Sequence, residues 1–332
     1  MQLHFSFIIP VYNRPEEIEE LLQSFSKMEG QDYEIVIVED GSSIDCKEVV
    51  QKFSDKLPIS YYFKENTGPG DSRNYGMRVA KGNYFIILDS DCILKPDYFK
   101  VVRSHLQNNF TDCFGGADTA HENFSSLQKA INFTMTSFIT TGGIRGHKKS
   151  IQKFEPRSFN MGISKKAFDE TGGFSKIHPG EDPDLSQRIL KAGLETQFIP
   201  NAQVFHKRRI SWSKFYTQVK KFGLVRPILN SWHPQSSKIT FWFPTLFVFF
   251  TMASLLLSFL WSIWACVPLL SYLLLVFFGA ALQNKSITIG FLALWAVLVQ
   301  FFGYGLAFLK STFYIRFLKK DPKKKFPHLF FK

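Results

Sequence analysis

The sequence has few cysteines, and none of them stands at a spacing that suits a metal site. We expect all four to be reduced thiols of a protein that faces the cytosol; they are Cys46, Cys92, Cys113 and Cys266. The first residues also lack the basic and then apolar pattern of a secretory leader, so we expect no signal peptide. No internal repeat or long low-complexity linker is visible, and 332 residues suffice for one large domain and a second region.

Most of the net positive charge lies in the last 23 residues, 310–332, and little lies elsewhere. The formal net charge is +12, and residues 310–332 supply +7 of it through eight Lys or Arg and one Asp. A protein that binds nucleic acid spreads basic and aromatic residues over a folded face, so this distribution argues against a nucleic-acid partner. Basic residues beside a hydrophobic block favour contact with membrane lipid instead.

Charged side chains are absent from the 42 residues 241–282 and again from 287–309. Because a spanning helix needs about 20 apolar residues, the first run predicts two helices with a break near Pro268, and the second predicts another. We therefore expect a multi-pass protein of the inner or plasma membrane with a cytoplasmic catalytic domain. Basic residues in 207–221 and 310–325 favour the cytoplasm for both flanks, which requires an even number of crossings and conflicts with three segments.

Residues 1–235 alternate between apolar strands and amphipathic helices. Helices are indicated by Ile18, Leu21, Leu22 and Phe25 at helical spacing and by residues 71–80. Strands are expected at 5–9, where Pro10 ends the run, and at 34–38, 59–63 and 84–88. This alternation predicts an α/β fold with a mostly parallel sheet and helices on both faces.

The strand at 84–88 ends at Asp89-Ser90-Asp91. Ligands of open α/β sheets bind at the carboxyl ends of the strands, so both carboxylates lie where a ligand is expected. Two carboxylates that share a site repel unless a positive charge lies between them. A hard divalent cation and the phosphates that it bridges fit this place. We expect Asp91 to ligate the metal, and Asp89 to contact a ribose or a metal-bound water.

Three other polar positions allow a functional or a purely structural interpretation. Asp40 follows a strand and precedes Gly41, so it either reads the imide N–H of a uracil-like base or caps a turn. Arg73 lies in the first turn of a helix, where it either binds phosphate or pairs with Asp71. The acidic pair Glu181-Asp182 either holds a general base or interacts with a helix dipole.

Five loops in order carry a resemblance to a known family. These loops are residues 9–13, 38–43, 65–76, 180–188 and 204–206. Together with Asp89-Ser90-Asp91 they resemble the inverting family-2 glycosyltransferases of GT-A fold, and the resemblance covers about residues 5–226. The apolar segments that follow resemble bacterial members that build cell-surface polysaccharides.

The resemblance implies a role for each loop. Asp182 is implied as the catalytic base, with Glu181 supporting it. His206 is implied as a late metal ligand beside Asp91, with Mn²⁺ or Mg²⁺ as the ion. The acceptor side of the site is implied to include Asn160 and Gly173. The nucleotide-sugar is implied to contact Pro10, Val11, Tyr12, Asp40, Arg73, Asp89 and Ser90.

We therefore expect a metal-dependent enzyme that transfers a sugar with inversion from a nucleotide-sugar, with UDP as the expected carrier, to a lipid-linked glycan or polysaccharide. The alternatives are a processive polysaccharide synthase, a polyprenyl-phosphate sugar synthase, and a nucleotide-sugar-binding membrane scaffold without turnover. Residues 218–222, Gln-Val-Lys-Lys-Phe, depart from the Gln-x-x-Arg-Trp segment of processive synthases. The expected organisation is a catalytic domain at 1–235, a membrane region at 236–310 and a polybasic tail at 311–332. The catalytic domain ends in a basic amphipathic interfacial helix at about 207–230.

Overall fold

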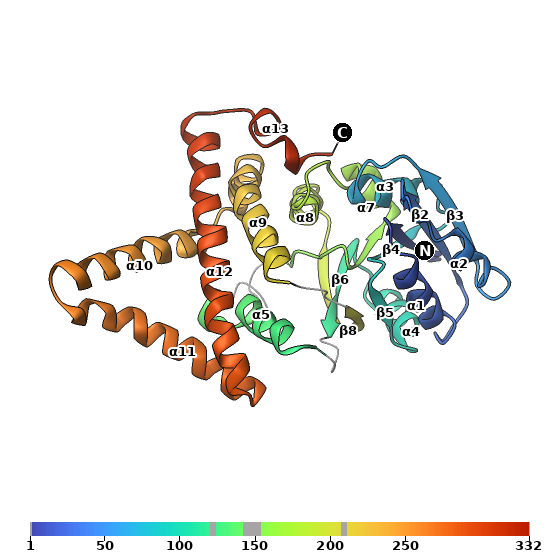
Figure 1. Cartoon of the computed structure of the whole chain (residues 1–332). Coiled ribbons are helices and arrows are strands. Elements are labelled where there is room, and N and C mark those ends of the chain that lie inside the picture. Colours follow the sequence, from blue (N-terminus) through green and yellow to red (C-terminus); the bar gives the residue numbers. More distant parts are fainter. Residues whose placement is uncertain (1, 120–123, 142–153, 207–210, 332) are drawn as a thin grey trace. The chain divides into compact units, whose positions relative to one another are not determined.

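The computed structural model describes residues 2–119, 124–141, 154–206 and 211–331, which form two compact units (Figure 1). Unit 1 comprises Met1–His121, Ile151–Lys207 and Phe330–Lys332. Unit 2 comprises Glu122–Ser150 and Arg208–Leu329. The last residues thus belong to the same unit as the first strands.

The described part of unit 1 is built on an eight-stranded sheet of order β3-β2-β1-β4-β7-β6-β8-β5. Its first four neighbours, β3 to β4, run parallel, whereas β7 is antiparallel to both β4 and β6. The strands are β1 (Phe5–Val11), β2 (Tyr33–Asp40), β3 (Ile59–Lys64), β4 (Tyr84–Leu88), β5 (Cys92–Leu94), β6 (Cys113–Thr119), β7 (Asn160–Ser164) and β8 (Thr196–His206).

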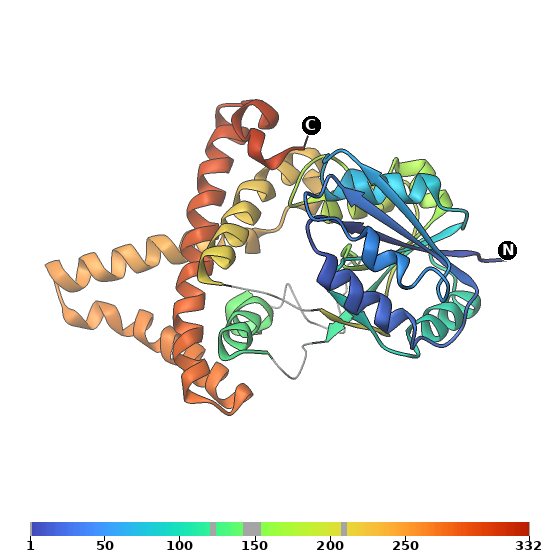
Figure 2. The ribbon, with the colours of Figure 1, turned by 45° about the vertical axis from the view of Figure 1, so that its right-hand side comes forward.

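Helices cover both faces of this sheet, as predicted. Alternate side chains of β1 enter different cores: Phe7 packs with α1 and α4, and Ile8 packs with α3, α7 and α8. In Figure 2 the dark blue α1 and the lighter blue α3 lie on opposite sides of the strands. The helices of unit 1 are α1 (Pro15–Phe25), α2 (Lys47–Gln51), α3 (Pro69–Val79), α4 (Tyr98–Asn108), α7 (Lys165–Thr171) and α8 (Glu181–Lys191).

The first strand runs one residue beyond the Pro10 that was expected to end it. Pro10 pairs in register with Val38 of β2, and β1 ends at Val11. On its other side, β1 pairs with β4 only as far as Ile8. Pro10 therefore lies where β1 has a single neighbour, a position that tolerates a residue without an N–H donor.

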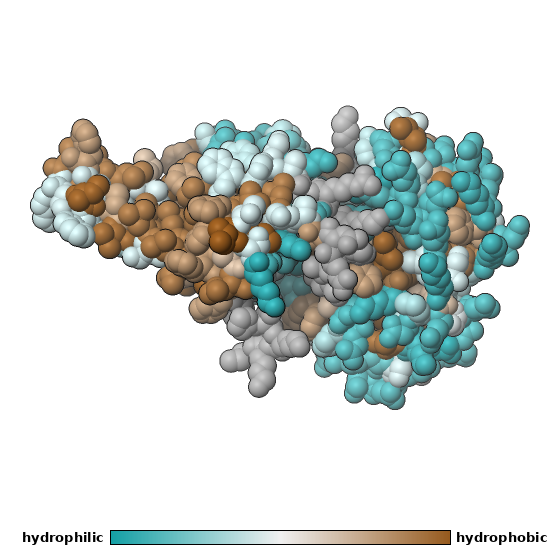
Figure 3. Space-filling model, turned by 60° about the horizontal axis from the view of Figure 1, so that its bottom comes forward, coloured by the Kyte–Doolittle hydropathy of each residue, from teal (hydrophilic) through white to brown (hydrophobic). Residues whose placement is uncertain are grey.

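Unit 2 is helical. The three expected apolar helices are present, with spans of 22, 22 and 31 residues at Ile239–Leu260, Ile263–Asn284 and Ile287–Phe317. Each is long and apolar enough to cross a membrane, and Figure 3 shows apolar residues gathered over α10 and α11. The helices are α5 (Ser126–Thr136), α6 (Phe138–Thr141), α9 (Trp212–Trp232), α10 (Phe243–Leu260), α11 (Val267–Asn284), α12 (Ile287–Thr312) and α13 (Pro322–Lys325).

The helix expected at the bilayer surface, α9, packs along α12. Small residues allow a close approach, since a Cβ added to Gly303 would lie 2.8 Å from the side chain of Val219. The hydroxyl of Ser311 also donates to the carbonyl of Leu224 over 2.6 Å. One side of α9 is therefore buried in protein, including Phe215 and Val219.

Candidate active site

The Asp89-Ser90-Asp91 turn follows β4 directly, and both of its carboxylates lie near guanidinium groups. Asp89 Oδ1 accepts a hydrogen bond of 2.8 Å from Arg73. Asp91 Oδ2 lies 3.8 Å from the nearest terminal nitrogen of Arg14. Positive charge thus lies beside both carboxylates of the turn, which offsets their mutual repulsion.

A buried glutamate that the sequence analysis missed holds this turn. Glu17 Oε2 accepts from Ser90 Oγ at 2.9 Å and from Arg14 at 3.0 Å. Burial acts to lower the pKa of Arg14, but attraction to Glu17, Asp91 and Asp89 raises it overall. Arg14 and Glu17 lie three residues apart at the start of α1, a spacing typical of a pair on one helix face.

Arg73 joins the Asp89-Ser90-Asp91 turn to the acidic residues at the start of α8. Arg73 is 4% exposed; one nitrogen of its guanidinium bonds Asp89, and another lies 3.3 Å from Glu181 Oε1. It also lies over the ring of Phe174. The structure therefore connects Arg73 with the site rather than with Asp71, whose charged partners are Lys64 and Arg78.

The three acidic residues at the start of α8 have different environments. Glu181 contacts Arg73 and lies 2.9 Å from His178 Nδ1, whereas Asp184 pairs with Arg188 on its own helix. Asp182 Oδ2 accepts from the backbone N–H of Ser158 at 3.2 Å. Asp182 Oδ1 is buried and has no hydrogen-bond partner among the described residues. Buried oxygens without a hydrogen-bond partner are uncommon in folded proteins, which makes Asp182 a candidate functional residue.

These environments shift the pKa values of Glu181 and Asp182 in opposite directions. Burial acts to raise the pKa of Glu181, but His178 and Arg73 hold it at about 2. For Asp182, burial and the negative charge of Glu181 outweigh Arg73 and Ser158 and raise the pKa to about 6. A carboxylate that titrates near neutral pH suits a general base.

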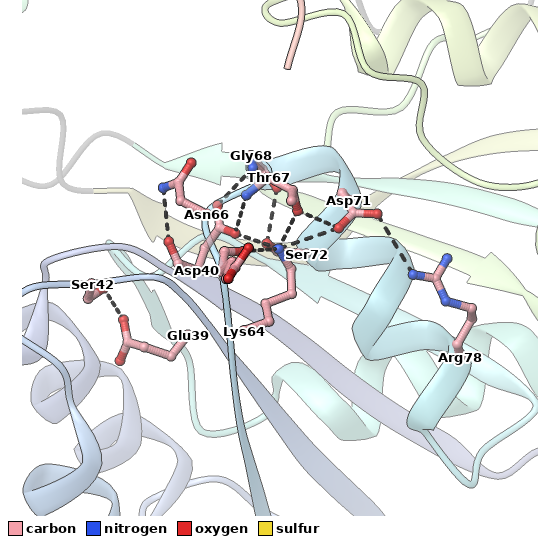
Figure 4. Close-up of polar contacts among 11 residues, drawn as sticks. Glu39, Asp40, Ser42, Lys64, Asn66, Thr67, Gly68, Asp71, Ser72 and Arg78 are labelled. Carbon is pink, nitrogen blue, oxygen red and sulfur yellow. Dashed lines mark hydrogen bonds and ion pairs between the residues drawn. The ribbon is translucent and has the colours of Figure 1, made fainter. Parts of the chain in front are cut away.

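Asp40 lies at the end of β2 and organises the loop that precedes α3. Figure 4 shows Lys64, Thr67 and Gly68 converging on its carboxylate. Lys64 Nζ and the N–H of Thr67 donate to Oδ1 at 2.6 and 3.0 Å, and the N–H of Gly68 donates to Oδ2 at 2.9 Å. Lys64 was missed, although Asp40 and Lys64 are directly paired in the parallel register of β2 and β3.

The end of β1 lies next to this loop. Val11 is buried and paired with Glu39, and Tyr12 is 51% exposed. Asn13 Oδ1 accepts from the N–H groups of Ser43 and Ile44, which ties the loop after β1 to the loop after β2. The expected base-side residues therefore meet at one edge of the sheet, with Pro10 half-buried and Tyr12 open to solvent.

The two residues expected on the acceptor side have structural contacts. Asn160 is fully buried; its amide accepts from Tyr98 at 2.6 Å and donates to the carbonyl of Ala202 at 2.9 Å. Gly173 has a φ of +75° and its carbonyl accepts from Arg188 at 2.7 Å. Both residues shape the backbone around β7 and α8 in this structure.

His206 is the last residue of β8, and its backbone pairs with Cys92, directly after Asp91. Its side chain lies outside the described residues. Within the described part of the chain, no three His, Cys, Asp or Glu side chains group as a metal site. A site of one or two carboxylates completed by substrate phosphates is the usual form for Mg²⁺, and Asp89 and Asp91 fit it.

Comparison with known proteins shows similarity over the first half of the chain. The family model "Glycosyl transferase family 2" matches residues 6–172, half of the chain. An uncharacterized glycosyltransferase of Haemophilus influenzae is 28% identical over 229 residues, which cover 65% of this chain and 73% of that protein.

Other relatives are much longer than the matched segment. TarS of Staphylococcus aureus, a poly(ribitol-phosphate) beta-N-acetylglucosaminyltransferase, is 30% identical over 114 residues, covering 33% of this chain and 20% of TarS. Two rickettsial glycosyltransferases are matched over only 17% of their length. Among solved structures, the mannosyltransferase PcManGT of Pyrobaculum calidifontis, in complex with GDP-Man and Mn²⁺, superposes with a TM-score of 0.58 at 15% identity. That match covers 97% of this chain and 89% of PcManGT.

Proposed function

The chain belongs to glycosyl transferase family 2, and from this premise we propose that it transfers a sugar from a nucleotide-sugar with inversion, using Asp182 as the general base. Its sheet and its likeness to PcManGT confirm the predicted GT-A fold. The observation that supports the proposed role most directly is Asp182 Oδ1, buried without a hydrogen-bond partner among the described residues.

In this reaction the acceptor hydroxyl attacks the anomeric carbon from the face opposite the leaving group. Its proton passes to Asp182 Oδ1 while the bond between the anomeric carbon and the diphosphate oxygen breaks, and the electron pair leaves with the diphosphate. Glu181 does not compete for that proton, because Arg73 and His178 stabilise its ionised form. Arg73 connects this base with the turn expected to hold the diphosphate.

Asp91 is the proposed ligand of a divalent cation, Mn²⁺ or Mg²⁺, with His206 as a further proposed ligand. Asp89 is proposed to contact the ribose or a metal-bound water. When bound, such a cation supplies Lewis-acid stabilisation of the charge on the leaving diphosphate. Ser90 keeps the turn in place through its bond to Glu17. Arg14 and Arg73 balance the two carboxylates in the structure described here.

The proposed donor carries uridine. A carboxylate offers about four acceptor positions, and Asp40 uses three of them for Lys64, Thr67 and Gly68. The remaining position on Oδ2 is enough to accept one imide N–H. We expect UDP to compete with the donor better than GDP or ADP; equal inhibition by the three would mean that the site reads phosphate alone.

The proposed acceptor is a lipid-linked glycan or a polysaccharide, presented to a catalytic unit on the cytoplasmic side. Three helices long enough to span a bilayer support a membrane-bound acceptor. The name of TarS, a poly(ribitol-phosphate) beta-N-acetylglucosaminyltransferase, supports a polymeric acceptor. Analysis of the product formed in vitro separates transfer to a glycan from transfer to a polyprenyl phosphate.

Titration calorimetry on the full chain tests the assignment of roles. We expect Asp91→Ala to lose metal-dependent binding of the nucleotide-sugar. Asp182→Asn should bind the donor normally and lose turnover about 100- to 10,000-fold, the usual contribution of a general base. Asp97→Ala, which removes an exposed carboxylate six residues after Asp91, is the control and should change neither property. Loss of donor binding in Asp182→Asn as complete as in Asp91→Ala contradicts the assignment.

A further inference from the structure

Phe330 and Phe331, the last described residues of the chain, pair with a backbone segment of unit 1. Phe330 forms an isolated antiparallel bridge with Ile177, and the N–H of Phe331 donates to the carbonyl of Lys176 at 3.0 Å. Ile177 is buried, so this contact is made with an anchored segment. Phe330 and Phe331 belong to unit 1, although about 120 residues of unit 2 precede them in the chain.

The ring of Phe331 lies between two loops of the candidate active site. On one side it packs directly on Gly68, because a Cβ added to this glycine would overlap the ring atoms. On the other side its centroid lies 5.8 Å from that of the His178 ring, at an interplanar angle of 53°. Gly68 has a φ of +94°, so its own backbone conformation also favours glycine.

Both neighbours of this ring contact residues with a proposed role in the reaction. The N–H of Gly68 donates to Asp40, the proposed base-reading carboxylate. His178 contacts Glu181, which precedes the proposed general base. Phe331 thus contacts both the loop proposed to hold the nucleotide base and the loop that carries the proposed catalytic carboxylates.

We propose that Phe331 is a positioning residue of the donor site: its ring fixes the Gly68 loop against His178 and forms an aromatic wall for the nucleotide. This inference rests on the proposed function. The ring is half-buried, so part of it stays accessible. An aromatic face is a suitable surface for a nucleobase, because every base can stack on it.

The test compares Phe331→Ala with Phe331→Tyr in the full-length protein in detergent, using calorimetric titration with UDP and Mn²⁺. We expect Phe331→Ala to weaken UDP binding by at least about fivefold, the lower range for loss of one aromatic–base contact. Phe331→Tyr keeps the ring and should bind within about twofold of the unaltered protein. The matched control is Phe110→Ala, which removes a 49% exposed ring that packs on Tyr84 in the same unit.

The melting temperature of each variant separates binding from folding. Loss of UDP affinity in Phe331→Ala at an unchanged melting temperature, restored in Phe331→Tyr, supports the positioning role. Unchanged or tighter UDP binding in Phe331→Ala overturns it, as does a loss that Phe331→Tyr fails to restore. If the unaltered protein binds no UDP, the proposed uridine donor is wrong. This result is distinct from failure of the Phe331 proposal, because it is seen in the unaltered protein before any variant is measured.

Discussion

At the scale of single residues, the main feature of the site is that two adjacent carboxylates, Glu181 and Asp182, have different surroundings and opposite pKa shifts. Glu181 faces Arg73 and His178, so its negative charge is stabilised although it is buried. Burial and the negative charge of Glu181 raise the pKa of Asp182, which accepts one backbone N–H. A single step along the chain therefore separates a carboxylate with a lowered pKa from one with a raised pKa.

The pH dependence of the reaction follows from this difference. Because Asp182 must be ionised to accept a proton, kcat/KM should fall about tenfold per pH unit below its pKa of about 6 and level off above it. Glu181, with a pKa of about 2, stays ionised over the same range and adds no step. A pH–rate profile between pH 5 and 8 measures this, with UDP binding as the control. A flat profile down to pH 5 contradicts the role of Asp182.

Removal of Arg73 should destabilise the protein as well as inactivate it. Arg73→Ala leaves the buried Glu181 without a guanidinium, and breaking a buried ion pair in this way costs about 3–5 kcal/mol. Arg78→Ala on the same helix removes an exposed pair with Asp71 and should cost less than about 1 kcal/mol. Thermal unfolding of both variants in detergent gives the comparison. Equal melting temperatures would show that Arg73 contributes nothing beyond a surface charge.

At the scale of elements, helix α3 is placed by a close approach to the sheet. It carries Arg73, and Gly76 one turn later faces β1, where an added Cβ would lie 2.6 Å from Ile8 Cγ2 and 3.2 Å from Val38 Cγ2. Both of these side chains are fully buried and branched at Cβ, so they have little room to move. The glycine therefore sets how near the guanidinium of Arg73 comes to the strand ends.

We expect Gly76→Ala to destabilise unit 1 despite the better helix propensity of alanine. Propensity favours alanine by about 1 kcal/mol, whereas inserting a methyl group into a filled core costs about 1–3 kcal/mol. The net loss should appear as a lower melting temperature, together with a fall in kcat because Arg73 is displaced. A melting temperature above that of the unaltered protein would show that Ile8 and Val38 can move aside to accept the added methyl group.

At the scale of the whole molecule, the chain returns to its first unit after the apolar helices. Phe330 pairs with Ile177 in unit 1, and six residues span at most about 20 Å, so Lys324 lies within that distance of unit 1. The hydrocarbon core of a bilayer is about 30 Å thick. The basic tail and unit 1 are therefore expected on the same side of the membrane, which favours an even number of crossings.

Labelling with a membrane-impermeant maleimide tests this arrangement. Lys324→Cys and Lys56→Cys introduce thiols at exposed positions, whereas Ser311 is buried against α9 and unsuitable as a probe. Three native cysteines are buried, so only the half-buried Cys266 needs replacement in the background. Both thiols should label from the cytoplasmic side in inverted vesicles. Labelling from opposite faces would mean that Phe330 leaves Ile177 in the membrane-bound protein.

The first four strands, the turn after β4 and the three apolar helices followed from sequence pattern, because hydrophobic periodicity and turn chemistry act over neighbouring residues. Asp89 and Asp91 were singled out for the same reason, because they directly follow a predicted strand, whereas the role expected of Asp182 came from the family resemblance.

The partners of these residues were decided only by the tertiary structure. Arg73 meets Glu181 from 108 positions away, and Phe331 reaches Gly68 across almost the whole chain. The opposite pKa shifts of Glu181 and Asp182 depend on burial, on the charges of His178 and Arg73, and on the hydrogen bonds of Ser158 in the loop before β7. Neither burial nor contact between distant segments is encoded in any local pattern, since both arise when separate elements pack together.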